Sequence, residues 1–420
     1  MALFETDRRI LALAMARMAD GVGNSFLIIV LPLYIASGIV EGRTFGLTES
    51  MLIGIVLSLV GFVSSLSQPV TGRVSDRTGR RKLYILIGLG GLTTANLLYL
   101  LAGSYLSLIA LRALQGMSIA FIIPASVALV NELAGAGTRG GNMGVYNTFR
   151  LVGFGAGPVA AGVLVNAGPY SILGFGLSGF EATFYVAAGA AALSFALVSA
   201  LVHDPAELER AGEDLSIDVL DGDGGLDPIF TLGVASLFMA IGIALFATLQ
   251  PEINARLDQG STWFGVQFAA FIISQVFLQV PIGRASDRWG RKPFILVGLV
   301  LLAPSTLAQG IVLDSWLMLV VRLTQGVAGA MVFAPALALA GDLATGGDSG
   351  SKLSVLTMAF GLGVALGPLS AGFLVGLGFV VPFAVGATLA LVGFGLVYTQ
   401  VEETVESGIH STGSDPAPQD

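Results

Sequence analysis

Five ionisable residues lie well inside long apolar stretches of the sequence, away from the ends of the stretches, where a charge is costly enough to indicate a specific role. They are Arg17, Asp20, Arg112, Arg150 and Arg322. Asp20 is the one acid of the set and falls about ten residues into the first stretch, near the middle of a bilayer at about 1.5 Å per residue. A carboxylate at this depth binds or releases a proton as its contact with water and with cations changes. We therefore predict that Asp20 is a proton-binding site.

The four arginines could neutralise Asp20 or bind an anion. Arg112 and Arg150 are expected at nearly the same depth as Asp20, so either could be its counter-ion, and the three residues form the predicted proton-coupling set. A purely structural pair with Arg17, three residues away on the same helix face, is the alternative for Asp20. Arg112 and Arg322 could instead donate hydrogen bonds to the carbonyl groups of broken helices.

Few other polar side chains interrupt the apolar stretches, and these are the candidate cavity-lining groups. With Arg112 and Arg322, they are Asn24, Asn147, Gln275 and Gln279. The surplus of arginine in the stretches would suit a ligand that carries a carboxylate or a phosphate. The 25 phenylalanines would instead suit a hydrophobic ligand. Both kinds of ligand remain open from the sequence.

Membrane-spanning helices are the elements that must position these residues. Hydrophobic residues make up 54% of the 420 residues and charged residues 11%, with a mean hydropathy of +0.84, whereas soluble domains are about a quarter charged. Twelve stretches reach the length of about 20 residues that crosses a bilayer. We expect them at 10–34, 49–71, 83–102, 105–131, 142–166, 179–201, 229–250, 262–283, 293–312, 315–340, 352–375 and 380–400.

The rarity of reactive side chains argues against an enzyme. The chain has no cysteine and two histidines, which excludes disulfides and thiolate metal sites. It also lacks a nucleotide-binding loop and a nucleophile–base set. We therefore expect no cofactor, no bound metal and no nucleic-acid partner, and an energy source other than ATP.

Three segments of the first half recur in the second half at offsets of 210 to 211 residues. The pairs are GRVSDRTGRRK at 72–82 with GRASDRWGRK at 283–292, RALQG at 112–116 with RLTQG at 322–326, and GFGAGPVAAG at 153–162 with GLGVALGPLSAG at 361–372. Repeats at one long period predict an all-α membrane protein of twelve transmembrane helices, arranged as two pseudo-symmetric six-helix bundles.

The predicted bundles span 1–202 and 229–400, with an acidic linker at 203–228 and a polar, disordered tail at 401–420. Lysine and arginine concentrate in the loops on the side of both termini, which predicts that this side is cytoplasmic. We expect a multi-pass protein of the plasma membrane, surrounded by lipid and monomeric.

The doubled pattern G-x-x-S-D-R-x-G-R-[RK] resembles the loop signature of the major facilitator superfamily, and the resemblance covers residues 8–400. It implies a secondary transporter that works by alternating access. It also implies a cytoplasmic latch between the halves, in which Asp76 faces the eleventh helix and Asp287 the fifth. The latch residues are Gly72, Asp76, Arg77, Gly79, Arg80, Gly283, Asp287, Arg288, Gly290 and Arg291.

Residue types within the latch agree with this role. Gly72 and Gly283 would let a helix end pack closely, and Gly79 and Gly290 would permit a turn with positive φ. The Asp76 carboxylate is expected to pair with Arg77 or Arg80, its neighbours in the sequence, and to face the positive end of another helix.

A pattern of small residues on the fifth helix resembles the antiporter motif of the drug/proton branch of this family. It comprises Gly144, Gly153, Gly157, Pro158 and Gly162, and departs from the motif at Ala161, where glycine is usual. Generic helix packing by small residues is the alternative. As an antiporter motif, the pattern favours exchange over uniport.

These features together predict a proton-coupled antiporter that exports a small amphipathic or drug-like molecule, with protons as the coupling ion. A proton-coupled carrier of an organic anion or metabolite is the main alternative, and the surplus of arginine favours it. A non-transporting membrane sensor or a lipid translocator ranks below both.

Overall fold

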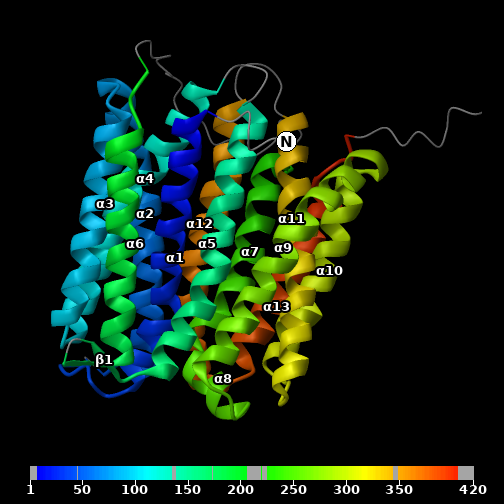
Figure 1. Cartoon of the computed structure of the whole chain (residues 1–420). Coiled ribbons are helices and arrows are strands. Elements are labelled where there is room, and N and C mark those ends of the chain that lie inside the picture. The colour runs from blue at the N-terminus through cyan, green and yellow to red at the C-terminus, as the bar shows by residue number, and fades with distance from the viewer. Residues whose placement is uncertain are drawn as a thin grey trace, which may run out of the picture.

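The computed structural model describes residues 7–44, 46–134, 139–172, 174–205, 219, 225–343 and 349–404. Most of the predicted linker 203–228 and of the predicted tail 401–420 lies outside these residues. The described chain is helical apart from one short hairpin and the loops, as Figure 1 shows.

The N-terminal half contains α1 to α6 and the C-terminal half α7 to α13. The helices are α1 (Arg8–Ala36), α2 (Glu49–Thr78), α3 (Arg81–Leu98), α4 (Tyr105–Leu133), α5 (Arg139–Ala167), α6 (Gly179–Leu201), α7 (Pro228–Thr248), α8 (Gln250–Arg256), α9 (Ser261–Trp289), α10 (Arg291–Gln309), α11 (Ser315–Leu343), α12 (Ser349–Leu374) and α13 (Val381–Gln400). One-turn 3₁₀ helices follow α3 (Tyr99–Leu101) and α12 (Val375–Leu377). Strands β1 (Tyr170–Ile172) and β2 (Phe175–Leu177) pair in an antiparallel hairpin between α5 and α6.

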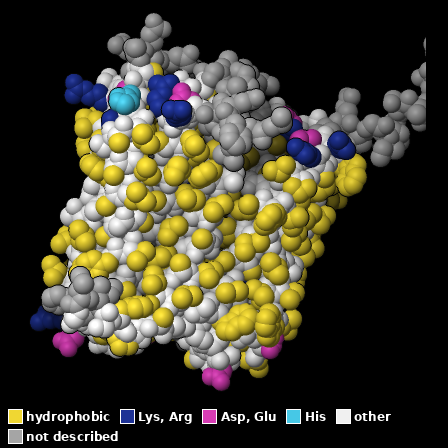
Figure 2. All heavy atoms as spheres, viewed as in Figure 1, with side chains coloured by type: hydrophobic (Ala, Val, Ile, Leu, Met, Phe, Trp, Pro, Cys, Tyr) yellow, Lys and Arg dark blue, Asp and Glu magenta, His cyan; other side chains and the backbone are white. Residues whose placement is uncertain are grey.

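Twelve of the described helices are long and apolar enough to cross a membrane, which confirms the predicted spans. The seventh predicted span is interrupted, because α7 ends at Thr248 and the short α8 begins at Gln250. Hydrophobic side chains cover the middle of the molecule in Figure 2, and basic side chains gather at its upper end. This upper end carries the start of α1 and the end of α13 and is called the termini end below; the opposite end is the far end.

Local sequence explains several helix ends, and the two halves use equivalent residues. The side chain of Asp7 accepts a hydrogen bond from Arg9 N at 2.8 Å and caps α1, and Asp227 caps α7 in the same way. At the termini end, Asp204 accepts from Lys82 N at the start of α3, and Glu403 accepts from Lys292 N at the start of α10. Carboxylates at helix N-termini are favoured because they satisfy free N–H groups.

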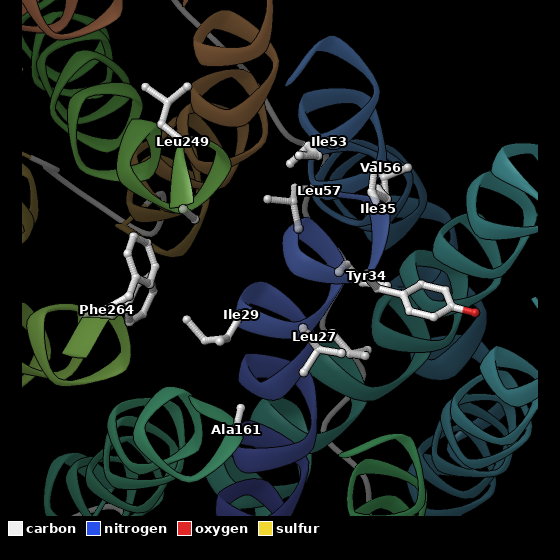
Figure 3. Packing of buried hydrophobic residues seen from close by; sticks show 14 of the residues in the cluster. Leu27, Ile29, Tyr34, Ile35, Ile53, Val56, Leu57, Ala161, Leu249 and Phe264 are labelled. Atoms are coloured by element: carbon white, nitrogen blue, oxygen red, sulfur yellow. The ribbon is translucent and has the colours of Figure 1, made fainter. Parts of the chain in front are cut away.

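The hydrophobic core shows how the halves meet. One cluster at the far end includes residues from both halves, among them Ile29, Leu57, Leu249 and Phe264. Figure 3 shows Ile29 of α1 and Leu57 of α2 on the side that faces Leu249 and Phe264. Toward the termini end the core divides into two clusters, one confined to the N-terminal half and one confined to the C-terminal half. The halves are therefore packed together at the far end and have separate cores at the termini end.

Two far-end seams, α2 with α12 and α5 with α9, join the halves through glycine contacts. A Cβ added to Gly162 of α5 would lie 2.5 Å from the carbonyl oxygen of Ser261 on α9. A Cβ added to Gly54 of α2 would lie 2.5 Å from the carbonyl oxygen of Pro368 on α12, and Gly372 of α12 lies against the backbone of α2. Only glycine permits backbones to approach this closely, so the far end is closed by backbone contact.

Candidate functional site

Asp20 lies inside the N-terminal half, on α1, and is 4% exposed. Its carboxylate forms an ion pair with Arg17, one turn earlier on the same helix. On its other side it lines a small pocket with Asn24, Asn96 and Gln115. A buried acid beside a single cation and neutral amides has few groups that stabilise its charge.

This arrangement differs from the expected counter-ions of Asp20 and agrees with the alternative, a pair with Arg17. The carboxylate pairs with Arg17, and neither Arg112 nor Arg150 forms an ion pair with it. A residue three positions along a helix is within reach whatever the tertiary packing. Equal depth in the membrane, on which the prediction of Arg112 and Arg150 rested, leaves open the direction in which each side chain points.

Arg112 of α4 is directed toward α2 and is 3% exposed. Its Nε donates to the carbonyl oxygen of Val56 at 2.9 Å, and its Nη1 donates to Gln115 Oε1 at 3.1 Å. Gln115 in turn accepts from Tyr99 at 2.9 Å and donates to Asn96 Oδ1 at 2.7 Å. Arg112 therefore joins α4 to α2, as the carbonyl-binding alternative expects, and ends a buried hydrogen-bonded chain that reaches the pocket beside Asp20.

Arg322 of α11 is the pseudo-symmetric partner of Arg112 and is fully buried. Its guanidinium donates to Gln325 and, at 3.4 Å, to the carbonyl oxygen of Gln267 on α9. The guanidinium carbon also lies 4.3 Å from the ring centre of Phe246 and 5.0 Å from that of Phe271. Aromatic faces stabilise a desolvated cation. Neither Arg112 nor Arg322 is accessible to a ligand in this conformation. Each instead joins its own helix to a backbone carbonyl of a neighbouring helix, and the two are called the clamps below.

Arg150 of α5 is half-buried, as Arg17 is, but it differs from the other arginines of the spans in its lack of a partner. Within the described part of the chain, the structure shows no ion pair or hydrogen bond for its guanidinium. Asn147, nearly one turn earlier on α5, is exposed. Arg150 therefore retains its full capacity to bind an acceptor.

The predicted cavity residues fall into three places. Asn24 lies beside Asp20, and the two clamps Arg112 and Arg322 are sealed inside their own halves. Asn147 of α5 and Gln275 and Gln279 of α9 lie on the two helices of one seam, on the termini side of the contact between Phe154 and Phe268, whose ring centres are 6.0 Å apart.

In the latch, Asp76 forms an ion pair with Arg81, not with Arg77 or Arg80. Arg81 also donates to Glu132 Oε1 of α4 at 2.9 and 3.1 Å and to Ser75 Oγ at 3.1 Å. The equivalent residue is Arg291, which pairs with Asp287 at 3.3 Å and with Asp342 of α11. Arg81 is thus the structural equivalent of Arg291, 210 residues later. Arg80 is an additional arginine that the loop signature of the first half contains and that of the second half lacks.

Each latch aspartate is bound within its own half. The described ion pair of Asp76 does not reach α12, which is the eleventh span, and that of Asp287 does not reach α5. Gly79 and Gly290 have φ values of 66° and 100°, as the turn requires. Gly72 makes only an ordinary contact with Pro124, and a Cβ on Gly283 would meet nothing within 4 Å. Among the described residues, the expected close packing at these two glycines is therefore not seen in this conformation. Arg77 and Arg288 are exposed.

The small-residue pattern of α5 has two packing partners. Gly153 and Gly157 lie against the backbone of α1 around Met18 and Val22, close to Asp20, whereas Gly162 belongs to the seam with α9. A Cβ added to Gly144 would meet no described residue of another element within 4 Å, Pro158 lies inside α5, and Ala161 is fully buried. The pattern therefore sets the spacing both within the half and across the seam.

The second half contains an equivalent pattern of small residues, which the sequence shows as the repeat of 153–162 at 361–372. Gly363 and Gly367 of α12 pack on α7, and Gly372 belongs to the seam with α2. The hydrogen-bonding residues Gln115, Gln325, Glu132 and Asp342 were missed. The first two could have been found, since both repeats contain R-x-x-Q-G.

Comparison with known proteins identifies the family. A model of the Major Facilitator Superfamily matches residues 13–216 and 232–418. An uncharacterized MFS-type transporter of Mycobacterium tuberculosis is 26% identical over 375 residues, 85% of this chain and 86% of that protein. Multidrug resistance protein 2 of Bacillus subtilis (strain 168) is 28% identical over 165 residues, 39% of this chain and 41% of that protein. The match thus spans about two fifths of this multidrug relative.

The fold agrees with that of solved transporters. A bacterial homologue of the human lysosomal transporter Spinster, in an inward-facing and occupied conformation, superposes with a TM-score of 0.73 at 13% identity, over 94% of this chain and 97% of the other. The chain belongs to the Major Facilitator Superfamily and is a secondary transporter, not an enzyme.

Proposed function

We propose that the chain couples proton binding at Asp20 to the transport of a small amphipathic molecule. The observation that carries the proposal is the burial of one acid, paired with one arginine, where α1 and α5 cross at glycine contacts. When the helices on either side of this crossing move, the carboxylate gains or loses water and changes its distance from Arg17. Either change alters its affinity for a proton.

Alternating access supplies the motion. The closed far end and the separate cores at the termini end describe one of the two states. With both termini cytoplasmic, as the basic residues favour, this state faces inward. In the opposite state the termini end closes, and the latch aspartates Asp76 and Asp287 then meet α12 and α5. We retain the bundle boundaries 1–202 and 229–400, a plasma-membrane location and a monomeric state as parts of this proposal.

Replacement of Asp20 by asparagine tests the coupling. In proteoliposomes with an imposed pH gradient, we expect the Asp20→Asn variant to lose gradient-driven accumulation by about tenfold or more, because its neutral side chain no longer responds to the gradient. Ethidium, tetracycline and a quinolone are suitable probes, since they are amphipathic and differ in charge. Accumulation is measured with and without the gradient.

The matched control is Asp258→Asn, at an exposed loop residue of the far end with φ 46°, which asparagine adopts as readily as aspartate. This control should transport as the wild type does. Equal gradient-driven accumulation by Asp20→Asn and the wild type would refute the role of Asp20. If the wild type moves none of the probes, the drug-export form below is wrong.

Exchange of protons for an exported drug-like molecule is the form that the relatives favour. The name of the Bacillus subtilis relative refers to multidrug resistance. The glycines of α5 agree with an antiporter motif, since Gly153 and Gly157 pack α5 directly onto α1 near Asp20. In this form protons enter as the cargo leaves.

A proton-coupled carrier of an organic anion or metabolite is the second form. Arg150 favours it, because this arginine has no partner within the described chain, and Asp20, the buried acid of the crossing, is bound to Arg17. A lipophilic cation would find no free carboxylate among the described residues at the crossing of α1 and α5.

A further inference from the structure

The crossing of α1 and α5 brings a second arginine close to the ion pair of Arg17 and Asp20. A Cβ added to Gly21 of α1 would lie 3.1 Å from the carbonyl oxygen of Arg150, and Gly153 of α5 lies against the carbonyl of Met18. Arg150 therefore leaves α5 at the level where Arg17 and Asp20 leave α1. The guanidinium groups of Arg17 and Arg150 are close enough for their charges to interact.

The cluster of Arg17, Asp20 and Arg150 carries excess positive charge. Both arginines stay protonated, so the cluster has a net charge of about +1 while Asp20 is ionised and about +2 when it is protonated. The described residues of the neighbouring elements that face the cluster are neutral: Tyr146 of α5 is hydrogen-bonded to Ser126 Oγ at 2.8 Å, and α6 contributes Ser194. An uncompensated cation near the middle of a membrane is expensive.

The arginines also have unused donors. The Nε of Arg17 is buried and donates no hydrogen bond. The guanidinium of Arg150 has neither an ion pair nor a hydrogen bond within the described chain. Two adjacent guanidinium groups with free donors match the oxygens of a carboxylate or a phosphate, which accept paired N–H bonds.

We infer that the transported molecule carries an acidic group, a carboxylate or a phosphate, which binds between Arg150 and Arg17. The inference rests on the proposed transport function and specifies the cargo of its second form. A monoanion brings the cluster to a net charge of zero while Asp20 remains ionised. Farther along α5, Phe154 and its neighbour Phe268 of α9 offer an apolar contact for the rest of the molecule.

Binding of the acid and protonation of Asp20 favour each other. A proton on Asp20 removes a negative charge from the cluster and releases Arg17 for the acid, and by reciprocity the bound acid favours the proton. A carrier that moves proton and cargo in the same direction needs the two to bind cooperatively, that is, with a favourable coupling free energy. Exchange of proton for cargo needs the opposite sign, so the sign of this linkage separates the two forms.

Binding to the purified full-length protein in nanodiscs tests the inference. The probes are three pairs that differ in the acidic group: octanoate and octanamide, 1-naphthylacetate and 1-naphthylacetamide, and phenyl phosphate and phenol. We expect the acids, and not their neutral partners, to raise the unfolding temperature of the wild type. Arg150→Gln should weaken binding of the acids by about tenfold or more, Arg43→Gln of the exposed far-end loop should leave it unchanged, and Asp20→Asn should tighten it by about fivefold or more.

Thermal unfolding of the variants without ligand is the control for folding of Arg150→Gln. Since this change removes an uncompensated charge, the variant should be at least as stable as the wild type, whereas Arg17→Gln, which leaves Asp20 unpaired, should be less stable. The inference is overturned if neutral and acidic partners stabilise the wild type equally, if Arg150→Gln retains the affinity, or if no acid stabilises the wild type. Acid binding through Arg150 without any gradient-driven transport would instead contradict the proposed function alone.

Discussion

Replacement of Gly372 by valine should open the far end of the transporter. Gly372 lies against the backbone of Ser50 and Met51 across the α2–α12 seam, and a Cβ there would be 3.1 Å from Met51 Cα. Overpacking of this kind costs about 1–3 kcal/mol. The state in which the seam is open does not bear this cost, so the equilibrium should shift toward it by about 5- to 150-fold.

The absence of cysteine makes this shift directly measurable. Spin labels on cysteines introduced at Ile39 and Leu313, which are exposed at the far end of opposite halves, report the distance across the seams by electron paramagnetic resonance. The wild type should give mainly the short distance, and Gly372→Val a population at longer distance. Gly162→Val, at the pseudo-symmetric seam, should act in the same direction.

Gly395→Val is the matched control, because nothing lies within 4 Å of a Cβ at this position of α13. It should leave the distance distribution as in the wild type. A Gly372→Val distribution identical to that of the wild type, or an equal change in Gly395→Val, would show that the glycine contacts do not close the far end.

Replacement of Arg81 by methionine should destabilise the protein by about 3–5 kcal/mol. Arg81 is 3% exposed and binds Glu132, Asp76 and Ser75 together. Its loss leaves the carboxylate of Glu132 without a partner, and one oxygen of that carboxylate already has none. A buried carboxylate deprived of its cation retains the cost of desolvation without the compensating attraction.

The internal repeat supplies the control for this prediction. Arg291 has the equivalent position, but the side chains of its partners Asp287 and Asp342 are 55% and 38% exposed. Water replaces the lost cation there, so Arg291→Met should cost about 1 kcal/mol or less. Thermal unfolding followed by tryptophan fluorescence compares the two. Adding Glu132→Gln to Arg81→Met should restore part of the stability. Equal losses at both arginines would contradict a role for burial.

Much of the fold was predictable because the signals are local or repeated. Apolar length alone located the twelve spans. The glycines at the ends of α2 and α9 predicted the turns, since positive φ depends on the residue itself. The repeat predicted two related halves, and the structure shows equivalent caps, clamps and seams in both. Arg81 was missed because Arg80 precedes it, and the start of α3 decides which of the two points inward.

Residue types and spacing by themselves determined that this chain crosses the membrane twelve times as two related halves, and that an acid and several arginines lie within the spans. They did so because hydrophobic length, glycine turns and repeats are properties of short segments. Tertiary structure decided which charges meet. The rotation of each helix about its axis directs Arg112 and Arg322 to carbonyl groups, Arg17 to Asp20, and Arg150 to no partner within the described chain. That rotation is set by the packing of neighbouring helices, which no single segment encodes.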